Sequence, residues 1–70
     1  METFQIQGDI ILLNQLLKAL NWCENGAQAN AVIDKGLVKV NGKVELRKRN
    51  KLTKGFVVEF DGNKVKLVQF

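Results

Sequence analysis

The sequence contains no histidine, serine or tyrosine, and it has a single cysteine, Cys23. The missing residues are the usual general bases and nucleophiles of enzymes at neutral pH. No imidazole is present to activate Cys23, so we interpret this thiol as a small packing residue beside Trp22. One cysteine without histidine does not provide the ligands of a zinc site. We therefore expect no enzymatic activity, no small-molecule substrate, no metal and no cofactor.

Long apolar runs are also missing. The longest, Ile10 to Leu13, is far too short to cross a bilayer, and the amino terminus shows no signal-peptide pattern. A lone cysteine forms no intrachain disulfide, which suits a reducing compartment. Seventy residues with 46% hydrophobic and 26% charged side chains are typical of one small globular domain. We expect a single domain over residues 1–70, monomeric and cytoplasmic, with no membrane partner.

Positive charge is concentrated in one part of the chain. The segment from Lys35 to Lys54 holds eight of the eleven cations and only one acid, Glu45, which gives it a net charge of +7. The other fifty residues hold three cations and six acids, a net charge of −3. Such a separation creates a directional field that steers anionic partners to one side of the molecule.

The first half of the chain predicts a strand and two helices. Residues Thr3 to Gln7 alternate apolar and polar side chains, as a half-buried strand does. Apolar residues at three- and four-residue spacing predict an amphipathic helix from Ile10 to Leu20, with Asp9 as its N-cap. Asn25 and Gln28 form a capping-box pattern for a second helix that ends at Gly36. The two form a helix-turn-helix-like pair.

After Gly36 the pattern changes to the two-residue period of strands. Val38, Val40, Val44 and Leu46 flank a turn at Asn41-Gly42. A two-residue turn would pair Val40 with Lys43 and place charges on the apolar face, so we expect a bulged or wider turn. Leu52 is the next apolar anchor, followed by strands from Phe56 to Phe60 and from Val65 to Val68. The order strand, helix, helix, strands indicates an α+β fold.

The basic run from Arg47 to Lys51 allows two interpretations. It could be a solvated loop that keeps a sheet edge from aggregating. The segregation of charge and the presence of both arginines of the chain, Arg47 and Arg49, favour polyanion binding instead, because a guanidinium matches phosphate oxygens bidentately. No aromatic residue lies between Trp22 and Phe56, so the segment itself offers no stacking platform for bases. Phosphate contacts and helix shape are the expected mode of recognition.

Several stretches together resemble a known family. They are Asn25-Gly26-Ala27-Gln28-Ala29, Ile33, Gly36-Leu37-Val38-Lys39-Val40-Asn41-Gly42-Lys43, Lys51-Leu52 and Gly55-Phe56-Val57-Val58. Together these stretches resemble the S-four RNA-binding domain, or alpha-L motif, and most closely its small stand-alone YbcJ-type members. The resemblance covers about Ile10 to Val68. It implies a two-helix pair packed on a small curled, mostly antiparallel sheet.

The resemblance also implies an RNA surface that joins the second helix to the loop after it. Mapped onto this sequence, that surface comprises Gln28, Lys35, Lys39, Asn41, Lys43, Arg47, Lys48, Arg49 and Lys51. One departure is that many members carry cations early in the second helix, where this chain has Gly26 and Asn30. Either the loop from Lys43 to Lys51 supplies most of the affinity, or the helix reads RNA through amides.

Family members act in translation and ribosome assembly, usually appended to enzymes, whereas this chain resembles a free binding module. We expect it to dock on structured RNA, either ribosomal RNA or tRNA, with ribosomal particles as a further partner. The alternative is a protein-interaction adaptor whose basic loop binds an acidic protein, favoured by a helix face that suits close packing against a partner: Gly26, Ala27, Ala29 and Asn30. An enzyme that uses Cys23 finds no support in the residues.

Overall fold

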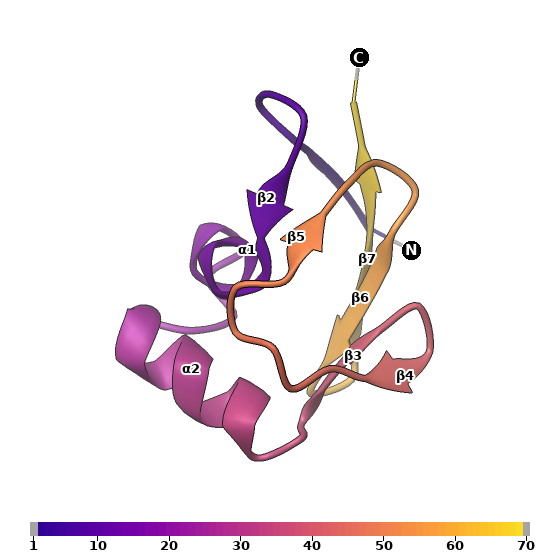
Figure 1. The fold of residues 1–70 in the computed structure, drawn as a ribbon. Coiled ribbons are helices and arrows are strands. Elements are labelled where there is room, and N and C mark those ends of the chain that lie inside the picture. Colours follow the sequence, from indigo (N-terminus) through magenta and orange to yellow (C-terminus); the bar gives the residue numbers. More distant parts are fainter. Residues whose placement is uncertain (1, 70) are drawn as a thin grey trace.

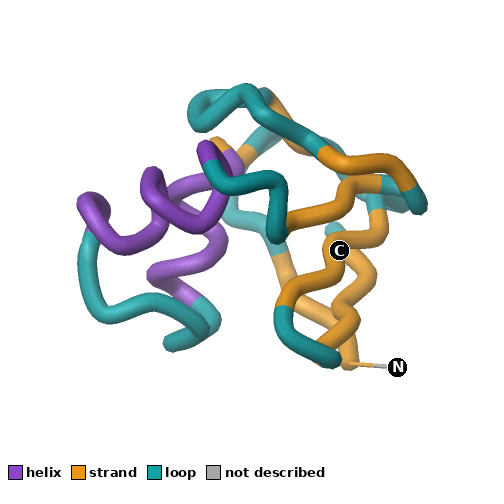
Figure 2. The backbone as a smooth tube through the Cα atoms, turned by 90° about the horizontal axis from the view of Figure 1, so that it is seen from below, coloured by secondary structure: helices purple, strands orange, loops and turns teal. Residues whose placement is uncertain are grey.

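The structure, a computed structural model, describes residues 2–69. Two helices lie on one side of the molecule and most of the strands on the other, as Figures 1 and 2 show. The elements in chain order are β1 (Glu2–Gln5), β2 (Ile11–Leu12), α1 (Leu13–Ala19), α2 (Gly26–Asp34), β3 (Val38–Val40), β4 (Lys43–Val44), β5 (Lys51–Leu52), β6 (Val57–Phe60) and β7 (Asn63–Val68). Neither helix is long and apolar enough to cross a membrane.

The main sheet has five strands in the order β1-β7-β6-β3-β4, and a separate ladder joins β2 to β5. The pairing of β1 with β7 is parallel, and the other pairings are antiparallel. The expected α+β class, with a helix pair on a mostly antiparallel sheet, is confirmed. The parallel pair and the β2–β5 ladder were not foreseen, because each joins segments some 40 or more residues apart.

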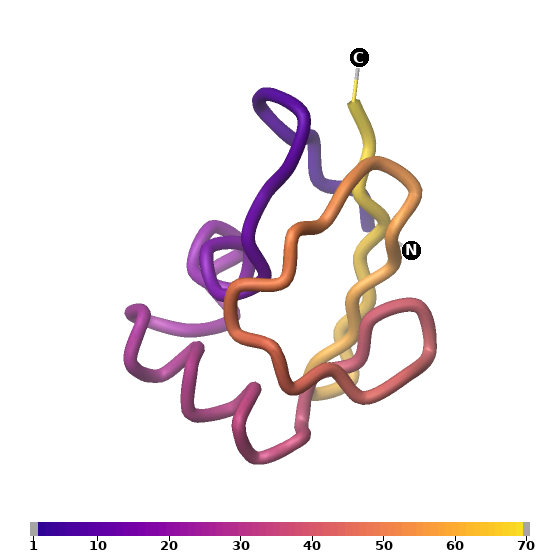
Figure 3. The backbone as a smooth tube through the Cα atoms, viewed as in Figure 1, coloured from indigo at the N-terminus to yellow at the C-terminus, as the bar shows by residue number. Residues whose placement is uncertain are grey.

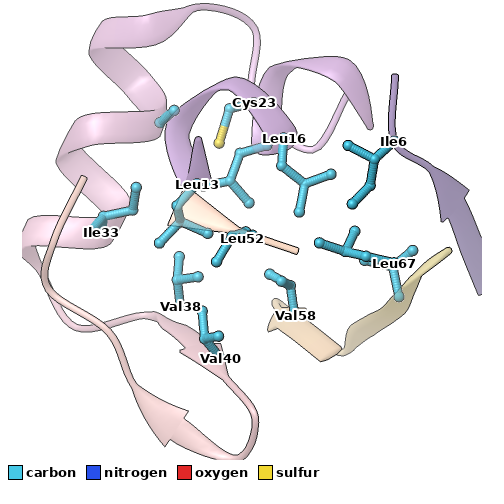
Figure 4. Close-up of a cluster of buried hydrophobic side chains, with 13 residues drawn as sticks. Ile6, Leu13, Leu16, Cys23, Ile33, Val38, Val40, Leu52, Val58 and Leu67 are labelled. Carbon is cyan, nitrogen blue, oxygen red and sulfur yellow. The ribbon is translucent and has the colours of Figure 1, made fainter. Parts of the chain in front are cut away.

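The core fills the space between the helix pair and the sheet (Figure 4). Its largest fully buried side chains are Leu13, Leu16, Leu17, Ile33, Val38, Leu52, Val58, Val65 and Leu67. Burying each such side chain contributes about 1.5–3 kcal/mol relative to leaving it exposed. Cys23 is also buried there, at 3% exposure. No polar or charged residue among residues 2–69 is buried, so the charged chemistry of the described chain lies on its surface.

Helix α2 begins and ends as its sequence predicts. The Asn25 side chain accepts a hydrogen bond from the Gln28 N–H at 2.8 Å, which is the expected N-cap. At the other end Gly36 has φ +75, and the N–H groups of Gly36 and Leu37 donate to the carbonyls of Ile33 and Val32. This is a Schellman motif, which requires a left-handed residue and therefore favours glycine.

The prediction for α1 was wrong at its start. A helix was expected from Ile10 to Leu20 with Asp9 as its cap, but Ile11 and Leu12 are extended and form β2. Leu12 is the N-cap residue of α1 and provides no side-chain hydrogen bond to the helix. The spacing of apolar residues could not reveal this, because the partner of β2 is β5, which follows it in the chain by about forty residues.

The expected wide turn at Asn41-Gly42 was also wrong. Asn41 has φ 53 and Gly42 has φ 84, the two left-handed residues of a tight hairpin turn, and Val40 faces Lys43. The expectation assumed that Val44 and Leu46 need burial, yet they are 53% and 59% exposed. Because β4 is a short edge strand, the preference of Asn-Gly for a two-residue turn decides the register.

The remaining strands lie close to their predicted positions. The expected strand at Thr3 to Gln7 is found at Glu2–Gln5, and the strand at Phe56 to Phe60 is found at Val57–Phe60. The last strand starts at Asn63, two residues before the predicted Val65, because the tight Asp61-Gly62 turn pairs Phe60 directly with Asn63.

The conformation of Gly36 predicts that alanine substitutions of the two glycines at the ends of α2 change stability differently. Gly36→Ala should lower the free energy of unfolding by about 1–2 kcal/mol, because φ is positive there. Gly26→Ala is the matched control, since a Cβ at Gly26 meets no atom within 4 Å, and it should leave stability unchanged or raise it by about 0.4–1 kcal/mol. Urea unfolding of the two variants measures both values. Equal effects would contradict the Schellman assignment.

Candidate nucleic-acid interface

The segment that joins β4 to β5, residues 45–50, carries the densest positive charge, and we call it the basic loop. Figure 3 shows it running beside the start of α1 and the end of α2. The Leu13 N–H donates to the Asn50 carbonyl and the Asn14 N–H to the Lys48 carbonyl, both at 3.0 Å. The first N–H groups of a helix have no partner within the helix, so the basic loop satisfies two of them. Its backbone is therefore fixed to α1.

Glu45 folds the basic loop onto itself. Its carboxylate accepts hydrogen bonds from the Arg47 N–H, Nε and Nη2 at 3.0, 3.0 and 3.1 Å, and from Asn50 Nδ2 at 3.0 Å. The Glu45 side chain is only 15% exposed, whereas that of Arg47 is 75% exposed. The Arg47 side-chain and backbone hydrogen bonds lower the pKa of Glu45. Glu45 therefore holds Arg47 and Asn50 in place within the basic loop.

Lys48 links the basic loop to the second helix. Its Nζ lies 3.1 Å from Asp34 Oδ2, at the last residue of α2. Both side chains are largely exposed, and such a pair contributes about 0–1 kcal/mol. A phosphate could replace Asp34 as the partner of Lys48 at little energetic cost.

Four of the sequence-predicted residues meet in one surface depression. Asn41, Lys43, Arg47 and Lys51 line a hollow of about 470 Å³, together with the half-buried ring of Phe56. Phe56 lies outside the basic run and was not a candidate, so the folded chain brings an aromatic side chain to the border of this surface. Arg49 shares a neighbouring depression with Arg47 and Lys51.

The other predicted residues lie apart from this group. Lys35 follows the last turn of α2 and is exposed. Lys39 lies on β3 opposite Glu59, on the outer face of the sheet, in a separate depression that also contains Lys64. Lys64 pairs with Glu59 at 3.7 Å. The structure therefore does not bring all predicted cations together: Lys35 lies at the end of α2 and Lys39 on the outer sheet face, apart from Lys43, Arg47 and Lys51.

The two predicted amides take part in internal hydrogen bonds. Gln28 Oε1 accepts from the Glu24 N–H at 2.6 Å, which strengthens the start of α2. Asn41 Oδ1 accepts from the Val57 N–H at 2.9 Å, and the Asn41 N–H donates to the Val57 carbonyl at 2.7 Å. Both side chains keep their amide NH₂ groups as exposed donors.

Sequence reasoning missed a second group of residues beside the basic loop. Lys48 and Arg49 share a depression with Asn14, Gln15 and Lys18 of α1 and Asn30 of α2. Nothing in the local sequence indicated this group, because α1 precedes the basic loop by about 30 residues. Its position depends on the hydrogen bonds that attach the basic loop to α1.

The part of the chain that the structure describes holds no metal-binding cluster, and its one thiol is buried. Among residues 2–69 no three His, Cys, Asp or Glu side chains are placed to hold a metal ion. Burial raises the pKa of the Cys23 thiol, which disfavours the thiolate needed for nucleophilic attack. Cationic and amide donors on the surface are the main chemistry of the candidate site.

Comparison with known proteins gives consistent matches. The family model of the S4 domain matches residues 4–68. The protein named "Putative RNA-binding protein YbcJ" of Escherichia coli (strain K12) is 50% identical over 56 residues, which are 80% of this chain and 80% of that protein. The "Uncharacterized protein YbcJ" of Shigella flexneri matches with the same values.

A solved structure is similar as well. It is the solution structure of YbcJ from E. coli, described as revealing an alpha-L motif involved in RNA binding. The TM-score is 0.71 with 44% sequence identity, and the match covers 97% of this chain and 87% of the other. The resemblance inferred from the sequence is confirmed.

The hydrogen bonds of Glu45 predict a pH-dependent change in the basic loop. Because the folded-state pKa of Glu45 is lowered, its contribution to stability is present above the ordinary glutamate pKa of about 4.3 and is lost as the pH falls through the lower folded value. In an NMR titration, the Arg47 amide resonance should shift with a midpoint below about 4.3. Glu45→Gln is the control and should abolish this titration. A midpoint at or above the ordinary glutamate pKa would contradict the hydrogen bonds between Arg47 and the Glu45 carboxylate.

Proposed function

This chain belongs to the S4 domain family, and from that premise we propose that it is an RNA-binding protein that docks on structured RNA. The observation that carries the proposal is the attachment of the basic loop to α1 by the Leu13 and Asn14 N–H groups. A loop whose backbone is already ordered loses less conformational entropy when it binds. The exposed cations of the loop are therefore pre-arranged for phosphates.

We further propose ribosomal RNA or tRNA as the target, in translation or ribosome assembly in the cytoplasm. The family resemblance favours these RNAs, and the single free thiol suits a reducing compartment.

Of the two arginines, Arg49 is expected to contribute more to phosphate binding. Arg47 is held by the Glu45 carboxylate, whereas no carboxylate of residues 2–69 forms an ion pair with Arg49.

A second candidate function is a protein-interaction adaptor. Leu37, Val44 and Leu46 are each more than half exposed, and Val44 and Leu46 lie beside Gly36. Exposed apolar side chains near Lys35 and Lys43 suit a partner that has both apolar and acidic groups. Pull-down before and after nuclease treatment separates the two functions, because a protein partner survives digestion of RNA whereas an RNA partner does not.

We predict how Arg49 affects the salt dependence of RNA binding. If about four to six phosphates are engaged, log K against log salt concentration should fall with a slope of roughly −3 to −5. Arg49→Gln should weaken binding to structured RNA about tenfold and make this slope about one unit less steep. Lys54→Gln removes the same charge outside the basic loop and should leave the slope nearly unchanged. Equal losses in both variants would show that net charge, not placement, determines affinity.

We also predict that Asp34, the acid that pairs with Lys48, lowers RNA affinity. Asp34→Asn should raise RNA affinity a few-fold, because it releases Lys48 and removes a negative charge beside the basic loop. The free energy of unfolding should change by less than about 1 kcal/mol, as for exposed ion pairs. Glu59→Gln changes the net charge equally but acts on the outer sheet face near Lys64. If Glu59→Gln raises affinity as much, the Asp34–Lys48 pair has no specific role.

A further inference from the structure

A depression of about 320 Å³ lies where α1, α2 and the basic loop meet, and we call it the helix–loop pocket. Three cations line it: Lys18 from the last turn of α1, and Lys48 and Arg49 from the basic loop. The amide side chains of Asn14, Gln15 and Asn30 complete its polar lining. No acidic residue lines it, so the pocket favours an anionic or acceptor-rich ligand.

The amides of the helix–loop pocket are oriented by hydrogen bonds within the protein. Asn30 Oδ1 accepts from Asn14 Nδ2 at 3.1 Å, and Gln15 Oε1 accepts from the Leu12 N–H at 3.4 Å. Since these oxygens are engaged, Asn30 and Gln15 have their NH₂ donors left for a ligand. Donor amides beside cations match the phosphate and the base carbonyls of a nucleotide.

Asn14 supplies a second indication of a ligand. Its Oδ1 is buried and has no hydrogen-bond partner among the described residues. A buried acceptor without a donor costs free energy, which a ligand can recover. Asn14 also lines the helix–loop pocket, so a nucleobase N–H that reaches its amide oxygen would supply the missing donor.

We propose that the helix–loop pocket holds one unpaired nucleotide of the bound RNA, an inference that rests on the proposed function. Its volume is at the lower end of the range of ligand pockets, about 300–1,000 Å³, and suits a single nucleotide rather than a duplex. Lys18 and Arg49 contact the phosphate, while Asn30 and Gln15 contact the edge of the base. No aromatic residue is among those that line the pocket, so the base is held by hydrogen bonds to its edge and not by aromatic stacking.

The test compares two RNA hairpins that differ only by one bulged nucleotide in the stem. The wild-type protein should bind the bulged hairpin about tenfold more tightly, since charge-assisted and amide hydrogen bonds form only with the extruded nucleotide. Lys18→Gln and Asn30→Ala should remove most of this preference. Lys54→Gln carries the same charge change as Lys18→Gln and should retain the preference. Because Lys18 is exposed, Lys18→Gln is informative even if Asn30→Ala disturbs the helix pair.

The outcomes distinguish a failure of the pocket proposal from a failure of the proposed function. Failure of the wild-type protein to bind either hairpin would refute the proposed function itself. Equal binding of both hairpins, or equal effects of Lys18→Gln and Lys54→Gln on the preference, would overturn the pocket and leave the RNA-binding proposal standing.

A direct probe uses uridine 5′-monophosphate and inorganic phosphate in separate NMR titrations. The nucleotide should shift the side-chain amide resonances of Asn14 and Asn30, and phosphate alone should not. If inorganic phosphate reproduces every shift, the pocket does not contact a base.

Discussion

The attachment of the basic loop to the start of α1 is the constraint on which the candidate surface depends. The helix begins at Leu13 with N–H groups that lack partners inside the helix, and the carbonyls of Lys48 and Asn50 satisfy two of them. The β2–β5 ladder directly before and after these residues keeps both segments in register. One set of backbone hydrogen bonds therefore starts a helix and also fixes the position of a highly charged loop.

Two acidic side chains, Glu45 and Asp34, offset part of the positive charge of the basic loop. Arg47, Lys48 and Arg49 follow one another within the basic loop, so their charges repel and ordering the loop costs free energy. Glu45 offsets part of this cost, because its nearly buried carboxylate receives four hydrogen bonds from Arg47 and Asn50. Asp34 adds a weaker restraint through Lys48. Arg49 thus projects from an ordered loop without a carboxylate partner in residues 2–69.

The success of the sequence predictions depended on the range of the interactions. The N-cap at Asn25 and the end of α2 at Gly36 were predicted correctly, because both depend on hydrogen bonds within a few residues. The wide turn at Asn41-Gly42 was wrong because local turn geometry prevailed over the burial of Val44. The start of α1 was wrong because Leu12 pairs with Lys51, far along the chain. For the candidate site, the sequence identified the cations but not their neighbours Lys18, Asn30 and Phe56.

By itself, the sequence determined the α+β class, the helix ends of α2, the family and the concentration of positive charge between Lys35 and Lys54. These properties are local or additive along the chain, so they can be read without knowing which segments meet. Only the tertiary structure decided which cations share a surface, which are held by Glu45 and Asp34, and that α1 contributes Lys18 and Asn14 to a pocket beside Arg49. The physical reason is that the backbone hydrogen bonds of Leu13 with Asn50 and of Asn14 with Lys48 place the basic loop beside α1, and the chain carries no side-chain pattern for such long-range backbone pairing.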